Sequence, residues 1–238
     1  MKLSTRFFRW HRWVGYLIAL QVLAWVLGGM VFAWVPFQGW VKVEDALIKP
    51  QQDLPADWVR ALAAAESLPT PLLSVGSVAT ASGPALKLRH AHGEHWLSAG
   101  GGELAQPDVE TIGRYARSLY RGGGALAGVE RLGEVPVRLL MVRELGERKD
   151  VWLARFDDGL STRFYFDGRS GELLAGRNDA WVAYDFFWRL HVMDYTHGKD
   201  FNNLLLRASA VAATGLVLTG LVLMVLALRR AARRRARP

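Results

Sequence analysis

The side chains best suited to chemistry in this chain are its six histidines, because the chain contains no cysteine. The absence of thiols excludes disulfides, thiolate metal sites and thiol nucleophiles. Imidazole nitrogens, by contrast, can bind zinc, copper or iron. The histidines form three groups: His11 near the start, His90, His92 and His95 in the middle, and His191 and His197 near the end.

His11 lies just before a long apolar run. On a helix it shares one face with Gly15, Ile18 and Gly29. Because glycine has no side chain, this face lets a flat ligand or another helix approach closely. Alternatively, His11 is an interfacial residue that contacts lipid headgroups together with its tryptophan and arginine neighbours.

His191 belongs to an aromatic pattern that predicts a helix within 179–203, before the second apolar run. The spacings of three and four place these residues on one helix face, and such a helix typically lies in the membrane interface. His197 could approach His191 only if residues 196–203 fold back. The alternative is an aromatic anchor with a hydrogen-bonded histidine. The pattern consists of Trp181, Tyr184, Trp188, His191 and Tyr195.

The middle histidines lie in a predicted hairpin. If His92 and Gly93 form a two-residue turn, His90 and His95 face each other across the two strands. Imidazoles placed in this way could bind zinc, copper or iron. The alternative is that these histidines are ordinary polar residues of an exposed hairpin turn and bind no ligand.

Two apolar runs, 14–35 and 204–228, predict two membrane-spanning helices, since a hydrocarbon core about 30 Å thick needs about 20 helical residues. Basic residues cluster in the tails 1–13 and 229–238, and all 22 acidic residues lie between the runs. Basic flanks stay in the cytoplasm, so both termini are expected there and the middle outside it. A cleaved signal peptide is the alternative, but its apolar region is usually only about 7–15 residues long. The basic charge is thus a topology signal, and nothing indicates nucleic-acid binding.

The region between the runs is expected to contain two modules, at about 53–106 and 107–178, each a helix followed by an antiparallel sheet. Helices are expected at 55–66 and 107–120. In the second helix, the stripe expected to be buried is Ile112, Tyr115, Ala116 and Leu119. The expected strands are 72–78, 85–90 and 95–98 in the first module, and 135–142, 150–156 and 162–166 in the second.

Both modules end in similar segments. The segment from Trp96 to Leu104 resembles the segment from Tyr165 to Leu173: an aromatic strand, a glycine turn and a Glu-Leu return. Each is expected to form a hairpin. We interpret the pair as an internal duplication, and chance similarity of two hairpins is the alternative.

Several segments carry a resemblance to a known family. They are Arg9-Trp10-His11-Arg12-Trp13-Val14-Gly15, Phe166-Asp167-Gly168-Arg169-Ser170-Gly171-Glu172-Leu173, Arg189-Leu190-His191-Val192-Met193-Asp194-Tyr195, Thr214-Gly215 and Thr219-Gly220. They resemble bacterial PepSY-domain proteins with PepSY-associated transmembrane helices. The resemblance implies a membrane α+β fold in the bacterial inner membrane, in which two transmembrane helices flank a periplasmic region of two PepSY-like modules.

Larger relatives in this family include inner-membrane ferric-siderophore reductases that carry haem. The resemblance therefore implies a haem b protein that passes electrons to a periplasmic acceptor, such as a ferric siderophore. Under this interpretation His11, His191 and His197 are the candidate haem ligands.

His11 and His191 are expected about one bilayer thickness apart, because a helix rises about 1.5 Å per residue. They cannot share one haem within one chain. A bis-histidine site would pair two chains in a homo-oligomer, or Met30 or Met224 would supply the second ligand. The small residues Ala208, Ala212, Gly215 and Thr219 would allow such an association, or would pack the two spans of one chain.

Motifs for nucleotide binding and for serine nucleophiles are absent from the sequence. A reductase would therefore take its electrons from a quinol or a partner protein. Two other functions stay open. One is a non-enzymatic PepSY scaffold or regulator that binds a periplasmic or membrane partner, and the other is a periplasmic metal-handling accessory protein that uses His90 and His95.

Overall fold

The computed structural model describes residues 3–51, 53–54, 57–64, 71–196 and 198–235 of the chain. The chain divides into two compact units. The helical unit contains Met1–Trp34 and Tyr184–Pro238, and the central unit contains Val35–Ala183. Helix α4, Asp179–Val192, begins in the central unit and ends in the helical unit.

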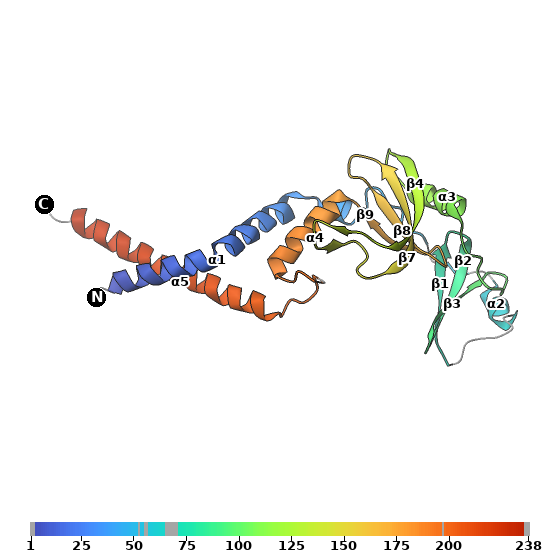
Figure 1. Ribbon diagram of the computed structural model, residues 1–238, viewed down its shortest axis with the longest axis horizontal. Coiled ribbons are helices and arrows are strands. Elements are labelled where there is room, and N and C mark those ends of the chain that lie inside the picture. Colours follow the sequence, from blue (N-terminus) through green and yellow to red (C-terminus); the bar gives the residue numbers. More distant parts are fainter. Residues whose placement is uncertain (1–2, 52, 55–56, 65–70, 197, 236–238) are drawn as a thin grey trace. The chain divides into compact units, whose positions relative to one another are not determined.

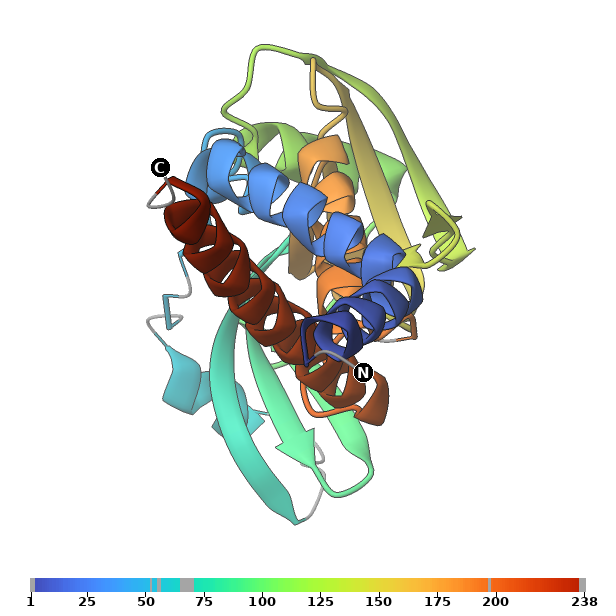
Figure 2. The same ribbon diagram turned by 90° about the vertical axis from the view of Figure 1, so that its left-hand side faces the viewer.

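Two long helices, α1 (Leu3–Trp34) and α5 (Leu204–Arg235), cross each other in the helical unit (Figures 1 and 2). Each is long and apolar enough to cross a membrane, over Thr5–Trp34 and Leu204–Arg233. Many of their apolar side chains are exposed, whereas a core helix of a globular protein buries most of them. The layout of two apolar helices flanking a central region is thus compatible with membrane insertion.

Helix α1 extends before the predicted span 14–35 and includes His11, which the sequence predicted to share a helix with Gly15. The predicted tail 1–13 is helical from Leu3, so Arg6, Arg9 and Arg12 lie on α1 itself. The physical reason is that this stretch contains neither glycine nor proline, so nothing interrupts the helix before the apolar run.

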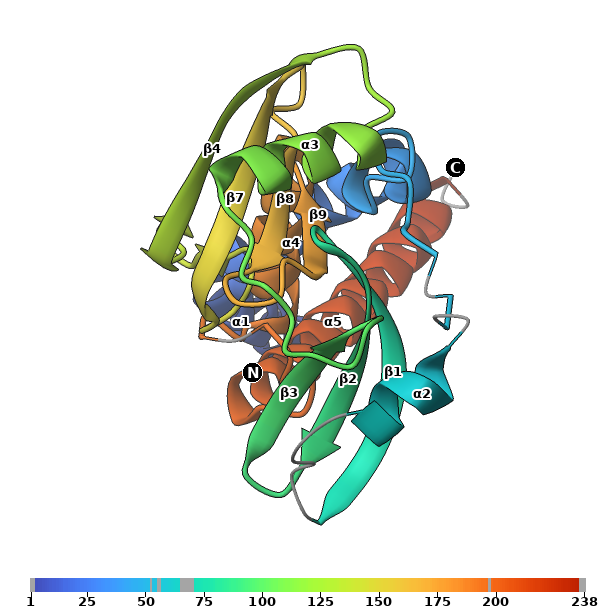
Figure 3. The ribbon, with the colours of Figure 1, turned by 90° about the vertical axis from the view of Figure 1, so that its right-hand side faces the viewer.

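The first part of the central unit is a three-stranded antiparallel sheet in the order β1-β2-β3, with a short helix against it (Figure 3). Ala61 and Leu62 of the helix pack on Leu86, Leu88 and Leu97 of the sheet. The elements are α2 (Trp58–Ala64), β1 (Leu72–Thr80), β2 (Gly83–His90) and β3 (Gly93–Ser98).

The second part is a four-stranded antiparallel sheet in the order β4-β7-β8-β9, and α3 lies across one of its faces (Figure 3). Ile112, Ala116 and Leu119 of α3 are buried against Phe164 and Phe166 of β8, which confirms the main part of the predicted stripe. The elements are α3 (Val109–Leu119), β4 (Ala125–Glu134), β7 (Lys149–Asp157), β8 (Arg163–Asp167) and β9 (Leu173–Arg177). A short π-helix, η1 (Phe37–Val41), precedes both parts.

The prediction of a strand at 135–142 was wrong. The long strand is β4, which ends before this segment, and the segment contains only the start of a separate small hairpin, β5 (Val137–Arg138) with β6 (Val142–Arg143). Proline interrupts the segment at Pro136, and Leu139 and Leu140 adopt positive φ in the turn. The true strand was missed because β4 is an edge strand with two glycines and exposed charged side chains, which weaken its apolar alternation.

The two parts share one element order, a helix followed by an antiparallel meander. Their closing segments also return antiparallel, but with registers that differ by one residue: Leu97 bridges Glu103, and Phe166 pairs with Leu173. The duplication remains our interpretation of this likeness. The two parts also contact each other, because Thr80 bridges Glu172 and the Lys87 amine lies 3.1 Å from the Glu172 carboxylate.

Candidate functional site

His11 of α1 is held by α5. Its Nδ1 lies 3.1 Å from the carbonyl oxygen of Leu216 and 3.0 Å from the hydroxyl oxygen of Thr219. A carbonyl only accepts hydrogen bonds, so Nδ1 is assigned as the protonated nitrogen. The Thr219 hydroxyl donates to Gly215 at 2.8 Å and therefore accepts from His11. In a neutral ring this tautomer places the remaining lone pair on Nε2.

Of the two glycines on the face predicted around His11, Gly15 lies against α5, whereas no neighbouring atom of the described residues is found within 4 Å of a Cβ placed on Gly29. A Cβ atom placed on Gly220 of α5 would lie 3.2 Å from Cε1 of His11, and one on Gly15 of α1 would lie 3.5 Å from the Leu216 side chain. Glycine thus lets the imidazole ring lie directly on the α5 backbone. Of the two interpretations of this face, the structure shows the approach of another helix.

His191 of α4 lies among aromatic side chains. Its ring centroid is 6.0 Å from that of Trp25, 5.9 Å from that of Phe32 and 6.4 Å from that of Trp188. Its Nδ1 is buried and makes no hydrogen bond within the part of the chain that the structure describes. The ring therefore lacks the acceptor that orients His11.

Helix α1 also satisfies the last turn of α4. The Gln21 side-chain amide donates to the carbonyl of Leu190 at 2.8 Å, and the Trp25 indole donates to the carbonyl of His191 at 2.9 Å. The final carbonyls of a helix have no partner within it, so these two side chains of α1 provide partners for the C-terminal carbonyls of α4. The helix stops at Val192, and the last member of the predicted aromatic stripe, Tyr195, is not on it.

The loop between α4 and α5 folds back on α4. The Trp188 indole donates to the carbonyl of Gly198 at 3.1 Å, and the Arg189 guanidinium donates to the carbonyl of Thr196 at 2.9 Å. A fold-back was the condition for an approach of His197 to His191, and the chain does fold back at Thr196 and Gly198. His197 itself lies outside the described residues.

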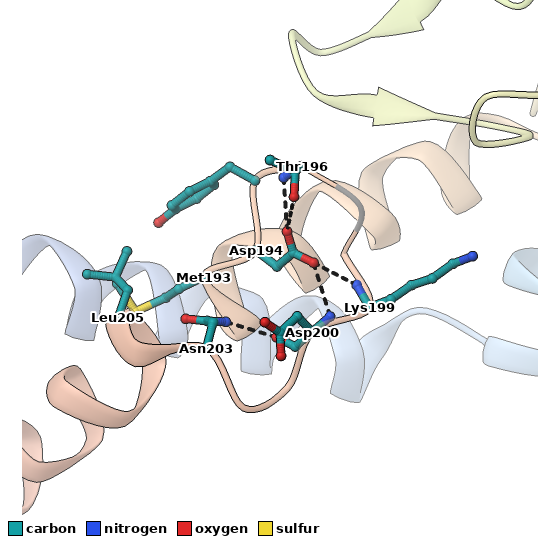
Figure 4. Close-up of a pocket in the computed structure, with 8 residues that line it drawn as sticks. Met193, Asp194, Thr196, Lys199, Asp200, Asn203 and Leu205 are labelled. Carbon is teal, nitrogen blue, oxygen red and sulfur yellow. Dashed lines mark hydrogen bonds between the residues drawn. The ribbon is translucent and has the colours of Figure 1, made fainter.

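Asp194 organises this loop (Figure 4). Its carboxylate accepts hydrogen bonds from the Thr196 backbone and hydroxyl and from the backbone N–H groups of Lys199 and Asp200. Asn203 then caps α5, because its side chain accepts from the N–H of Leu206. Beside the loop is a pocket of about 690 Å³ lined by Met193, Asp194, Tyr195, Thr196, Lys199, Asp200, Asn203 and Leu205. Sequence reasoning missed this pocket.

The predicted pairing of His90 with His95 was wrong. His90 pairs with Gly93, and His95 pairs with Leu88, because the two-residue turn is formed by Ala91 and His92 rather than by His92 and Gly93. Within the described part of the chain, no group of three or more histidine or acidic side chains is arranged to hold a metal ion. A metal at this hairpin stays a prediction.

A buried ionic cluster in the central unit was not anticipated from the sequence. Glu144 accepts hydrogen bonds from Arg163 at 2.9 Å, from the Tyr165 hydroxyl at 2.7 Å and from Arg138 at 3.1 Å. Arg163 also donates to Asp179 at 2.8 Å. These groups neutralise one another, so the cluster is a structural element rather than a free reactive group.

The histidines can be compared with the needs of a haem ligand. Such a ligand offers one unprotonated nitrogen, while an acceptor holds its other N–H. His11 has this arrangement, and His191 does not, because its Nδ1 has no partner among the described residues. Helix α1 rises about 20 Å between His11 and Trp25, which contacts His191. The two histidines therefore belong to separate places, as the sequence predicted.

Searches against protein-family models, curated proteins and solved structures find no match to this chain. The motifs and the geometry described above therefore carry the functional argument by themselves.

Proposed function

We propose that this chain is a PepSY-type protein of the bacterial inner membrane that binds haem b and passes electrons to a periplasmic acceptor, with a ferric siderophore as the family-level candidate. The observation that carries the proposal is the state of His11. Its Nδ1 donates to Leu216 and Thr219, so its Nε2 is available as a ligand. The central unit would lie in the periplasm, because the basic tails favour the cytoplasm.

In this proposal Nε2 of His11 would hold the haem, and Thr219 and the Leu216 carbonyl hold the ring of His11. Haem b supplies one-electron chemistry when it is bound. The second ligand comes from another copy of the chain or from Met224, which lies one helical turn beyond Gly220 on α5. Ligation between copies implies a homo-oligomer.

The decisive test is the absorption spectrum of the full chain, purified in detergent from haem-replete cells. We expect a sharp Soret band and resolved α and β bands on reduction. His11→Ala should remove most of this haem, whereas His92→Ala, at the exposed hairpin tip, should remove none. Thr219→Val keeps the Leu216 acceptor, so it should retain haem but shift the reduction midpoint, because one hydrogen bond to the ligand is lost. Colourless wild-type protein, or full haem content in His11→Ala, would disprove the assignment.

A second candidate function is a scaffold that binds a periplasmic partner. The supporting observation is strand β1, an edge strand of its sheet whose only pairing on the outer side, among the described residues, is the bridge from Thr80 to Glu172. Its outer half exposes Leu72, Leu73 and Val75. An edge strand with exposed apolar side chains can accept a further strand from a partner. Because the chain has no cysteine, Leu73→Cys would allow site-specific crosslinking, and Glu110→Cys on exposed α3 is the control.

A further inference from the structure

The pocket beside Asp194 lies where the polar loop meets the apolar helix α5, and all of its lining residues belong to the helical unit. One side is apolar, formed by Met193 and Leu205 at the start of α5 (Figure 4). The other side is polar and includes Asp200 and Asn203. This pairing of apolar and polar walls fits an amphipathic ligand.

We propose that this pocket binds the headgroup of a phospholipid that carries an ammonium group. The proposal rests on the embedding of α5 in a bilayer, and it is independent of haem binding. Leu204, Leu205 and Phe201 are all exposed beside the pocket, and the apolar run of α5 continues directly from them. A lipid lying against α5 would therefore bring its headgroup to the level of this loop.

The charges of the pocket favour a cationic group. Two carboxylates, Asp194 and Asp200, line it together with one amine, that of Lys199. The Asp194 carboxylate holds the loop, whereas Asp200 is exposed and accepts a hydrogen bond at 2.9 Å from the N–H of Asn202. Asp200 is thus the carboxylate best placed to meet an ammonium group.

Tyr195 and Lys199 complete the recognition. Tyr195 is half exposed in the pocket wall, and an aromatic ring attracts an ammonium group through its π face. Lys199 points away from Met193 and Leu205 (Figure 4), so its flexible side chain would have to change rotamer to meet the phosphate of a lipid bound beside them. A zwitterionic headgroup carries both a positive and a negative charge, whereas an anionic glycerol headgroup offers Asp200 hydroxyl donors but no positive charge.

The loop is already arranged for such a ligand. Asn203 donates to the carbonyl oxygens of Val192 and Asp200, at 2.8 and 2.9 Å, and the Asp194 carboxylate accepts hydrogen bonds from the backbone N–H groups of Thr196, Lys199 and Asp200. Binding therefore requires little ordering of the chain, which lowers its entropic cost.

Native mass spectrometry of the delipidated full chain in detergent tests the proposal, with phosphatidylethanolamine, phosphatidylcholine and phosphatidylglycerol added separately. We expect one tight adduct with each ammonium lipid and weaker binding of phosphatidylglycerol. Asp200→Asn keeps an oxygen for the N–H of Asn202 and removes the charge, so the loop is retained. It should weaken phosphatidylethanolamine binding by up to about fivefold, as expected for loss of one exposed charge pair.

Asp157→Asn, which removes an exposed carboxylate from the central unit, is the matched control and should change nothing. Phosphatidylglycerol binding through the arginine-rich ends should be equal in all three proteins. Equal affinity of wild type and Asp200→Asn for phosphatidylethanolamine would overturn the proposal, and so would a wild-type preference for phosphatidylglycerol. These measurements do not depend on haem content, so their outcome is independent of the test of the proposed function.

Discussion

Arg163 and Glu144 form a salt bridge that is closed to solvent: their charged atoms are 2.9 Å apart, and their side chains are 2% and 0% exposed. Burial of two charges is expensive, and the attraction between them compensates only when further hydrogen bonds satisfy both groups. Here Glu144 also accepts hydrogen bonds from Tyr165 and Arg138, and Arg163 also donates one to Asp179. The pair ties the segment before β7 to strand β8.

Glu144→Ala should destabilise the central unit by about 3–5 kcal/mol, because it leaves the Arg163 guanidinium buried without its main partner. The measurement is thermal or denaturant unfolding of the full chain in detergent. Glu147→Ala, which removes an exposed carboxylate from the same segment, is the control and should change stability by less than about 0.5 kcal/mol. Equal effects of the two substitutions would contradict a structural role for the cluster.

Asp167 should make the free energy of unfolding of the central unit depend on pH in the acidic range. Burial raises the pKa of its carboxyl, but hydrogen bonds from Ser170, Arg148 and Arg169 outweigh burial and hold the pKa below the usual 3.8. A carboxyl with a lowered pKa stabilises the fold fully above its unfolded-state pKa, and this contribution disappears as pH falls through the folded-state pKa. We therefore expect the unfolding midpoint of the protein to decrease when the pH is lowered below about 4.

Asp167→Asn removes this titrating group, so the acid dependence should be shallower than in the wild-type protein. The comparison needs unfolding curves at a series of pH values from about 2 to about 7, a range that brackets the ordinary pKa of an aspartate. Parallel pH profiles of the two proteins would show that Asp167 does not contribute.

Gly220→Val should loosen the crossing of α1 and α5, because a side chain there would collide with the His11 ring. Gly215→Val is the matched control on the same helix, since no atom lies within 4 Å of a Cβ placed on Gly215. The thermal midpoint of the helical unit, followed by circular dichroism in detergent, should fall for Gly220→Val only. If haem is present, its content should fall with it.

The orientation of the chain can be tested with reporter fusions. A fusion at Gly159, in the exposed turn after β7, should report the periplasm, and a fusion at the C-terminus should report the cytoplasm. A cytoplasmic signal at Gly159 would remove the basis for a periplasmic electron acceptor.

The hairpin histidines should be dispensable. His90→Ala combined with His95→Ala should leave folding and haem content unchanged, because His90 pairs with Gly93 at an exposed turn. Loss of a stoichiometric metal from the double variant, measured by elemental analysis, would instead favour the metal-handling function.

Much of the fold could be predicted because its signals are local. The two apolar helices follow from uninterrupted runs, and the stripe of α3 follows from its periodicity, with Asp108 as the N-cap that accepts from Thr111. Strand β4 could not be recognised, because an edge strand carries glycines and charges where an inner strand carries apolar residues.

The candidate site was predictable only in part. His11 was identified from its residue type and its glycine neighbours, but its partner Leu216 contributes a backbone carbonyl, which leaves no signal in the sequence. The Glu144 cluster depends on contacts between residues far apart in the chain, and a single glutamate before β7 shows no pattern. The pocket beside Asp194 arises from a loop fold set by backbone N–H groups, which every residue type except proline provides.

The contact of Glu172 with the first sheet determines how the central unit comes apart. Glu172 follows β8, yet it bridges Thr80 and pairs with Lys87, and the carbonyl of Gly171 accepts from the N–H of Ala81 at 3.1 Å. Residues of the segment after β8 therefore pair with the edge of the smaller sheet. Loss of the larger sheet would remove these contacts from the smaller one, so limited proteolysis should not release a protected fragment of the smaller sheet.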